Sequence, residues 1–135
     1  MGTQDLHVTS LPVTISQDEF QHSAVVISVN KSINKWSCYN AVRYAWKISA
    51  TRVRRADIVL AVDRRLIVGV FVAKEWLPAT KENFPDRAEN SGSPGRFGFI
   101  GHEASAEIQQ IYLHKRLPEW FRKPGAANPI KYVGL

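Results

Sequence analysis

The sequence contains a single cysteine, Cys38, which excludes an internal disulfide framework and a zinc site built from several cysteines. Its four histidines are scattered, and no two of them lie at the spacing of metal ligands. Phosphate-loop, dinucleotide-binding and nucleophile-elbow motifs are missing as well. We therefore expect a protein with no cofactor and no metal, and a binding module is favoured over an enzyme.

Long apolar runs are also missing. The longest, residues 66–73, is too short to span a bilayer and has the character of a strand. The N-terminus lacks the positive start and apolar run of a secretion signal, and the lone cysteine suits a reducing compartment. We expect a cytoplasmic protein that does not interact with membranes. Residues 1–22, rich in Thr, Ser and Gln, predict a loose N-terminal arm, and residues 23–135 predict a single domain.

Positive charge, by contrast, is abundant in one stretch. Between Lys31 and Arg65 there are nine basic and two acidic residues, a net charge of +7, whereas the whole chain carries +6. A localised positive field attracts phosphate groups and steers polyanions. A solvated basic face that only keeps the protein soluble is the alternative. Aromatic residues interleaved with these cations favour a site for a polyanion.

Residues 37–47 predict one short helix, with Ser37 as its N-cap. Residues three or four apart share a helix face, so Tyr39, Arg43 and Trp46 would form a stripe of two rings and a guanidinium. Three arginines follow before the next strand: Arg52, Arg54 and Arg55. Bases stack on rings and guanidinium planes while cations hold their phosphates, so this segment is typical of nucleic-acid binders.

The rest of the chain predicts short strands and one more helix. The strands are expected at 24–29, 57–62, 66–72, 96–101 and 129–133, with a tight hairpin at 63–65 and a helix at 103–113 capped by Ser105. Residues 80–95, rich in Pro, Gly and Asn, predict a flexible loop. This order favours an α+β fold with a curved mixed sheet or open β-barrel and two or three short flanking helices.

Several motifs between Trp36 and Val133 form a set. They are Tyr39-x-Ala41-x-Arg43-x-x-Trp46, Arg96-Phe97-x-Phe99-Ile100-Gly101, Tyr112-Leu113-x-Lys115-Arg116 and Asn128-Pro129-Ile130-Lys131-Tyr132-Val133. As a set they resemble a small bacterial domain that we associate with restriction and defence proteins. The strand order of that domain resembles the PUA-like superfamily, which includes the YTH, EVE and ASCH groups. Such domains are β-barrels with flanking helices, and several of them read a modified or flipped-out base in an aromatic-lined cleft. The three-tryptophan cage of the YTH pattern and the EVE signature are both missing, so the resemblance leaves the base open.

The resemblance implies a base pocket between the helix at 37–47 and the strand ends. Its walls would be Tyr39, Trp46 and Trp76, and Ser37 and Asn40 would offer hydrogen bonds to the base edge. A basic patch would hold the phosphates, and it comprises Arg43, Arg52, Arg54, Arg55 and Arg96. For the two tryptophans a structural role is the alternative: Trp76 would plug the end of the barrel, and Trp46 would belong to the core.

The leading hypothesis is therefore a nucleic-acid-binding module for DNA or RNA, with an effector protein as a further partner. One alternative is a metal-dependent nuclease or base-modifying hydrolase, with its site at His102 and Glu103 or in the loop at 80–95. Another is a protein-interaction domain whose aromatic stripe docks a peptide. The sequence does not separate DNA from RNA and indicates no oligomeric state.

Overall fold

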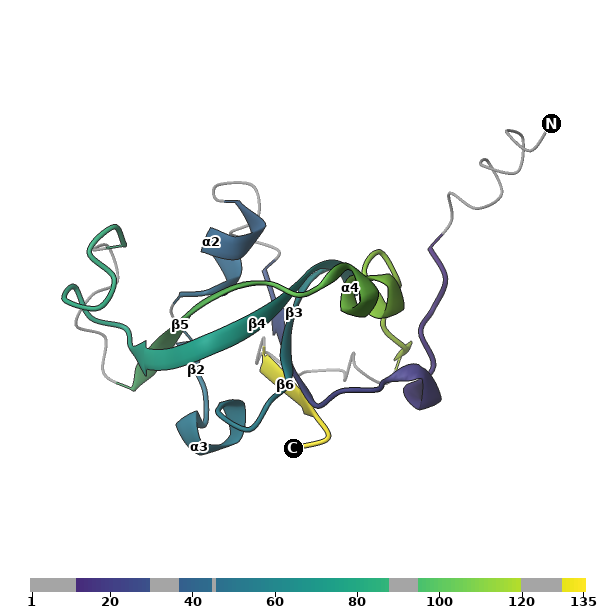
Figure 1. Ribbon diagram of the computed structural model, residues 1–135, viewed down its shortest axis with the longest axis horizontal. Coiled ribbons are helices and arrows are strands. Elements are labelled where there is room, and N and C mark those ends of the chain that lie inside the picture. Colours follow the sequence, from purple (N-terminus) through teal and green to yellow (C-terminus); the bar gives the residue numbers. More distant parts are fainter. Residues whose placement is uncertain (1–11, 30–36, 45, 88–94, 120–129) are drawn as a thin grey trace.

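A six-stranded mixed sheet curves into a nearly closed barrel in the computed structural model, which describes residues 12–29, 37–44, 46–87, 95–119 and 130–135 (Figure 1). Its strands are β1 (Ala24–Ser28), β2 (Trp46–Lys47), β3 (Ile58–Asp63), β4 (Leu66–Pro78), β5 (Arg96–Glu103) and β6 (Ile130–Val133). The described residues also form the helices α2 (Cys38–Val42), α3 (Ala50–Val53) and α4 (Ala106–Tyr112), and a 3-10 turn, η2 (Gln17–Glu19). The expected α+β class with a curved, barrel-like sheet is confirmed.

The strand order in the sheet is β2-β5-β4-β3-β1-β6, with β1 and β3 parallel and the other neighbours antiparallel. The long strand β4 connects the two halves, because its first part pairs with β3 and its second part with β5. The register of β4 shifts between Ala73 and Glu75, and such bulges bend a strand. Gly101 lies opposite this bulge, where an added Cβ would be only 2.0 Å from the carbonyl oxygen of Val72. Glycine is thus required for β5 to follow the bend.

The hairpin between β3 and β4 matches its prediction. Arg64 and Arg65 occupy its two turn positions with φ values of 52° and 70°. A two-residue turn with both residues in the left-handed region fits the twist of the flanking strands. The hairpin therefore directs β4 back along β3.

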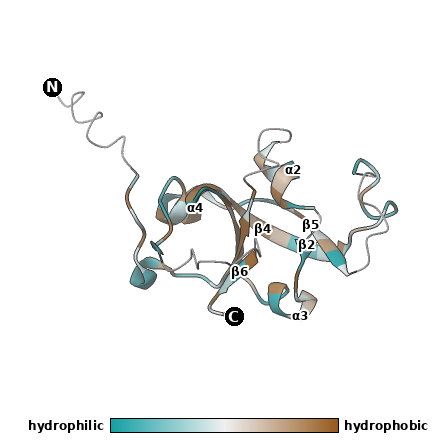
Figure 2. Ribbon diagram, turned by 180° about the vertical axis from the view of Figure 1, so that it is seen from behind, coloured by the Kyte–Doolittle hydropathy of each residue, from teal (hydrophilic) through white to brown (hydrophobic). Residues whose placement is uncertain are grey.

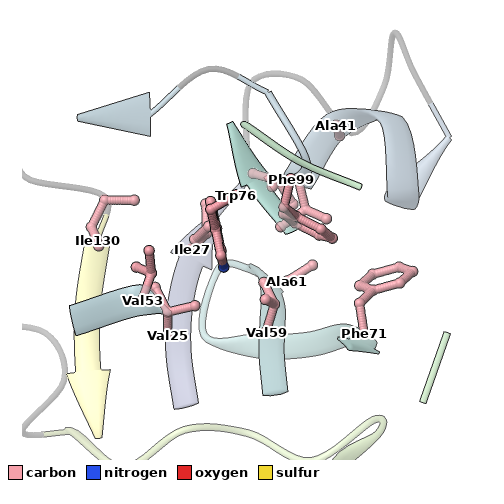
Figure 3. Close-up of a cluster of buried hydrophobic side chains, with 12 residues drawn as sticks. Val25, Ile27, Ala41, Val53, Val59, Ala61, Phe71, Trp76, Phe99 and Ile130 are labelled. Atoms are coloured by element: carbon pink, nitrogen blue, oxygen red, sulfur yellow. The ribbon is translucent and has the colours of Figure 1, made fainter. Parts of the chain in front are cut away.

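Both faces of the central strands β1 and β3 are buried, as their nearly continuous apolar sequences predicted. On one face, Val26 and Leu60 belong to a cluster that includes Tyr112 of α4. On the other face, Val25 and Val59 point into the barrel (Figure 3). Each face has its own core, so the sheet is the middle layer of the molecule.

Tyr132 on β6 links the two edges of the sheet, β6 and β2. Its hydroxyl accepts a hydrogen bond from the backbone N–H of Ser49 at 3.1 Å, and the guanidinium of Arg52 lies 4.2 Å from its ring centroid. Ser49 follows β2 closely and is the N-cap of α3, accepting from the N–H of Arg52. The sequence did not predict α3, because a four-residue helix has too few positions to show a periodicity.

The helix predicted at 37–47 is too long. Helix α2 begins after Ser37, the expected N-cap, but ends at Val42. Trp46 then lies in β2 and pairs with Phe97 on β5. Its indole N–H donates to the carbonyl oxygen of Val42 at 2.7 Å. This oxygen belongs to the last residue of α2, where backbone carbonyls have no partner within the helix. Trp46 therefore does not share a helix face with Tyr39.

Part of the arm predicted to be loose is packed. Ile15 is completely buried, and Thr14 forms a β-bridge with Arg116; residues 1–11 lie outside the described part. In the loop predicted at 80–95, residues 80–87 form turns, and residues 88–94 lie outside the described part. No helix among the described residues is long and apolar enough to cross a membrane.

Replacing Tyr132 by Phe should lower the free energy of unfolding by about 1–2 kcal/mol, because the half-buried N–H of Ser49 would lose its acceptor. The ring beneath Arg52 would remain, so only the hydrogen bond is tested. Urea unfolding followed by tryptophan fluorescence would measure the change. Unchanged stability would mean that the link between the sheet edges does not depend on this bond.

Candidate functional site

Trp76 is a core residue. It is 5 % exposed, and its ring centroid lies 5.0 Å from that of Phe99. It is also the ladder partner of Phe99 on β5, and cross-strand partners share a face of the sheet, here the one that points into the barrel (Figure 3). The prediction that Trp76 forms the wall of an open cleft is therefore wrong; it fills the barrel interior, as its structural alternative proposed.

Trp46 is half-buried and packs against the same cluster. Its ladder partner, Phe97, also belongs to that cluster, so both rings face inward. Because its N–H donates to Val42, the polar end of the indole is used within the fold. Trp46 and Trp76 are thus parts of one core rather than two walls of a cleft.

Arg43 is also structural. It is 8 % exposed, and one of its terminal nitrogens lies 2.6 Å from a carboxylate oxygen of Asp86. Its Nε donates to the side-chain oxygen of Asn40 at 2.9 Å. The guanidinium lies 5.5 Å from the ring centroid of Tyr39 and 5.4 Å from that of Phe84. The prediction that Arg43 binds phosphate is wrong, because it is enclosed between α2 and the segment after β4.

Arg87, which the sequence did not single out, has a similar role. It is 4 % exposed, donates to the backbone carbonyl of Asn40, and lies 4.9 Å from the ring centroid of Tyr44. Asn40 therefore supplies acceptors to two buried arginines. Its side-chain oxygen and its backbone oxygen are thus used within the fold, and a hydrogen bond from the half-buried Asn40 to a base stays a prediction. An arginine within a polar loop gives no sequence signal for such burial.

Ser37 and Tyr39 do line a recess, which has a volume of about 370 Å³. We call it the α2–β5 recess, and its lining residues are Ser37, Cys38, Tyr39, Phe71, Gly101, His102 and Glu103. The hydroxyl of Tyr39 accepts from the N–H of Gly101 at 3.1 Å, and its ring packs 5.7 Å from that of Phe71. Two of the five predicted base-pocket residues are thus brought together. Their partners from β4 and β5 include His102 and Glu103, which the sequence indicated only for the enzyme alternative.

Cys38 forms part of the floor of this recess. Burial raises the pKa of its thiol to about 11, and the negative charge of Glu103 adds to the rise. The thiol is therefore protonated at neutral pH, and its sulfur lies 3.7 Å from the carbonyl oxygen of Val68. His102 and Glu103, the residues of the enzyme alternative, are exposed at the end of β5. Among the described residues, no three His, Cys, Asp or Glu side chains are grouped so that they could hold a metal ion.

Three of the other predicted phosphate-binding residues, Arg52, Arg54 and Arg55, lie in or directly after α3, and this helix is on the opposite side of β4 and β5 from α2 (Figure 1). Arg52, Arg54 and Arg55 are exposed. A terminal nitrogen of Arg54 lies 3.5 Å from the carbonyl oxygen of Trp76. Arg54 shares a groove with Lys74 of the β4 bulge, and this groove has a volume of about 340 Å³.

Two further cations lie beside this groove. Lys47 on β2 and Arg96 on β5 are direct ladder partners. Pro78, which lines the groove, pairs with Phe97, the residue next to Arg96. Viewed from behind, β2 and the strand ends beside it carry the hydrophilic colour (Figure 2). We call this set the α3 surface: Lys47, Arg52, Arg54, Arg55, Lys74 and Arg96.

No family model matches this chain, and no curated protein or solved structure is significantly similar to it. The geometry of the two candidate sites is therefore the basis for any proposal about function. The α3 surface is cationic, and the α2–β5 recess combines rings with a carboxylate. They lie on opposite sides of β4 and β5 (Figure 1). The prediction that aromatic walls and arginines form a single cleft is therefore wrong.

Replacing Arg43 by Ala should lower the free energy of unfolding by about 2–3 kcal/mol, because the packed guanidinium and its hydrogen bond to Asn40 would be lost together. The Asp86→Asn variant is the matched control. The side chain of Asp86 is 61 % exposed, so its loss should cost about 1 kcal/mol or less. Chemical denaturation of both variants would measure the decrease in the free energy of unfolding. Equal decreases would contradict a buried role for Arg43.

Cys38 should react slowly with iodoacetamide. At pH 8 a thiol with a pKa of about 11 forms about 100-fold less thiolate than one with the ordinary cysteine pKa of 9.0, so the native protein should be alkylated about 100-fold more slowly than the urea-unfolded protein. The folded pKa is the higher one, so the thiol should lower stability as the pH rises from about 9 towards 11. Equal alkylation rates would show that the thiol is not buried.

Proposed function

We propose that the protein is a nucleic-acid-binding module that holds DNA or RNA by its phosphate groups on the α3 surface. The observation that carries this proposal is a groove lined by two cations, Arg54 and Lys74. The exposed Arg55 follows Arg54 directly, and the ladder pair of Lys47 and Arg96 lies next to the groove residue Pro78 and its partner Phe97. One carboxylate, Glu75, lines the groove with Arg54 and Lys74. A surface of this composition attracts phosphate by releasing counterions.

The residues of the α3 surface suit phosphate in their chemistry. From Lys47 to Arg55 the chain has four cations and no carboxylate. Guanidinium groups are planar and present paired N–H donors, which match two phosphate oxygens at once. The arginines at positions 54 and 55 follow the short helix directly and are exposed. They can therefore reach a polyanion without unfolding any part of the core.

The pairing of Lys47 with Arg96 gives independent support. The two residues bring positive charges to one position of the sheet, and neighbouring cations attract phosphate. The pair lies at one end of the sheet, next to the residue pair Pro78 and Phe97, so it extends the groove rather than forming a remote site.

We also propose that the chain is a PUA-like domain that acts in the cytoplasm beside a defence-associated effector protein. The barrel-like mixed sheet with short flanking helices supports this assignment, together with the motif set in the sequence. Base recognition by Trp46 and Trp76 is no longer part of the proposal, because both rings pack in the core.

Replacing Arg54 and Arg55 together by Ala should weaken binding to every single-stranded DNA and RNA by about tenfold or more. Each lost phosphate contact should also reduce the slope of log K against log salt concentration by about 0.7, because fewer counterions are released. Fluorescence anisotropy with labelled 20-nucleotide strands at several salt concentrations would measure both quantities.

The matched control removes two cations at the other end of the molecule, in the Arg64→Asn/Lys115→Ala variant. Asn tolerates the left-handed backbone at position 64. The ion pair between Lys115 and Glu19 is long, at 3.7 Å, so its removal should have little effect on stability. This variant should change affinity and slope little. If both double variants bind alike, net charge rather than the α3 surface explains the affinity, and the proposal fails.

A further inference from the structure

The α2–β5 recess contains a carboxylate in a protein whose net charge is +6. Glu103 is the last residue of β5, and its charge acts on the thiol of Cys38 across the recess. None of the described cations forms an ion pair with it; the ion pairs among described residues join Arg43 to Asp86, Arg65 to Glu119 and Lys115 to Glu19. The carboxylate can therefore accept hydrogen bonds from a ligand.

The floor of the recess is apolar and rigid. Tyr39 is held by its hydrogen bond to Gly101, and its ring packs against Phe71 and Phe99 at centroid distances of 5.7 and 5.9 Å. Cys38 adds a protonated, uncharged thiol. A floor that is fixed before binding reduces the entropy lost when a ligand is ordered on it. An apolar, aromatic lining of this kind suits the face of a ring.

Two polar groups at the rim complete the recess. The hydroxyl oxygen of Ser37 accepts from the N–H of Asn40 at 3.2 Å, so its own hydrogen can still be donated. Nδ1 of His102 lies 2.8 Å from the carbonyl oxygen of Glu103. If Nδ1 carries the proton in this bond, Nε2 is an acceptor. The recess thus offers one donor and several acceptors beside an apolar floor.

From this geometry we infer that the α2–β5 recess is a binding site for a planar heterocycle with two adjacent N–H donors, paired with the carboxylate of Glu103. A guanine-type ring has such an edge, in which the ring N–H and the exocyclic amine can meet the two carboxylate oxygens. Charge-assisted pairs of this kind are short and directional. The volume of about 370 Å³ falls within the range of small-molecule pockets.

This site is separate from the α3 surface and does not need it. The ligand could be a free heterocycle or a base within a nucleic acid, since both present the same edge. A nucleoside without phosphate tests the recess alone. A strand containing one guanine then tests whether the recess also takes a base that is part of a chain.

Guanosine is the probe, titrated into the protein and followed by calorimetry and by the amide NMR signal of Gly101. Inosine lacks the exocyclic amine, so it should bind about tenfold more weakly, and adenosine should also bind weakly. The Glu103→Gln variant should lose about tenfold in guanosine affinity. The Glu107→Gln variant is the matched control, because Glu107 is an exposed glutamate of α4 that does not line the recess.

A second arm compares single strands that carry guanine or hypoxanthine at one position. Discrimination that disappears with Glu103→Gln would identify a base in a strand as a ligand, whereas discrimination confined to nucleosides would identify a free heterocycle. Thermal unfolding would verify that both glutamate variants fold. Absence of guanosine binding to the folded protein, or equal binding by inosine and by the Glu103→Gln variant, would overturn the inference. Either result would leave the α3 surface untouched, since guanosine has no phosphate.

Discussion

The double pairing of β4 is the constraint on which the rest of the molecule depends. One strand pairs with β3 in its first part and with β5 in its second part, and the bulge after Ala73 lies between the two. Gly101 permits this bend because β5 must approach the carbonyl of Val72 too closely for any side chain. The bend directs β5 towards α2 and exposes the second part of β4 to α3. Both candidate sites therefore originate at the same irregularity.

Backbone groups of β4 and β5 also form hydrogen bonds outside the sheet ladder. The N–H of Gly101 donates to the hydroxyl of Tyr39, and the N–H of Phe99 donates to the carbonyl of Arg43. On the other side, the guanidinium of Arg54 approaches the carbonyl of Trp76. Tyr39 and Arg54 thus have structural as well as candidate binding roles. Among the described residues, none forms an ion pair with the carboxylate of Glu103, so its substitution separates ligand binding from folding more cleanly.

Much of the fold could be predicted from local patterns. The strands, the hairpin and the N-caps Ser37 and Ser105 follow from apolar runs and short polar residues, whose effects act over a few positions. The site could be predicted only in part. Arg43 and Arg54 look alike in sequence, yet one is enclosed by Phe84 and Asp86 and the other is exposed, and this difference is set by a segment more than forty residues from Arg43.

The clustering of basic residues along the sequence also predicted a single basic site, which the fold does not form. The segment with a net charge of +7 is divided in space, because Arg43 is neutralised by Asp86, while Arg64 and Arg65 form the hairpin turn at the far end of β3 from α3. What remains lies near α3, on the opposite side of β4 and β5 from α2 (Figure 1), and α2 borders the recess that contains Glu103. A nucleotide whose phosphate is held at α3 would therefore have to reach past β4 and β5 to place its own base in the α2–β5 recess. If both sites act on nucleic acid, this arrangement favours their binding to different nucleotides.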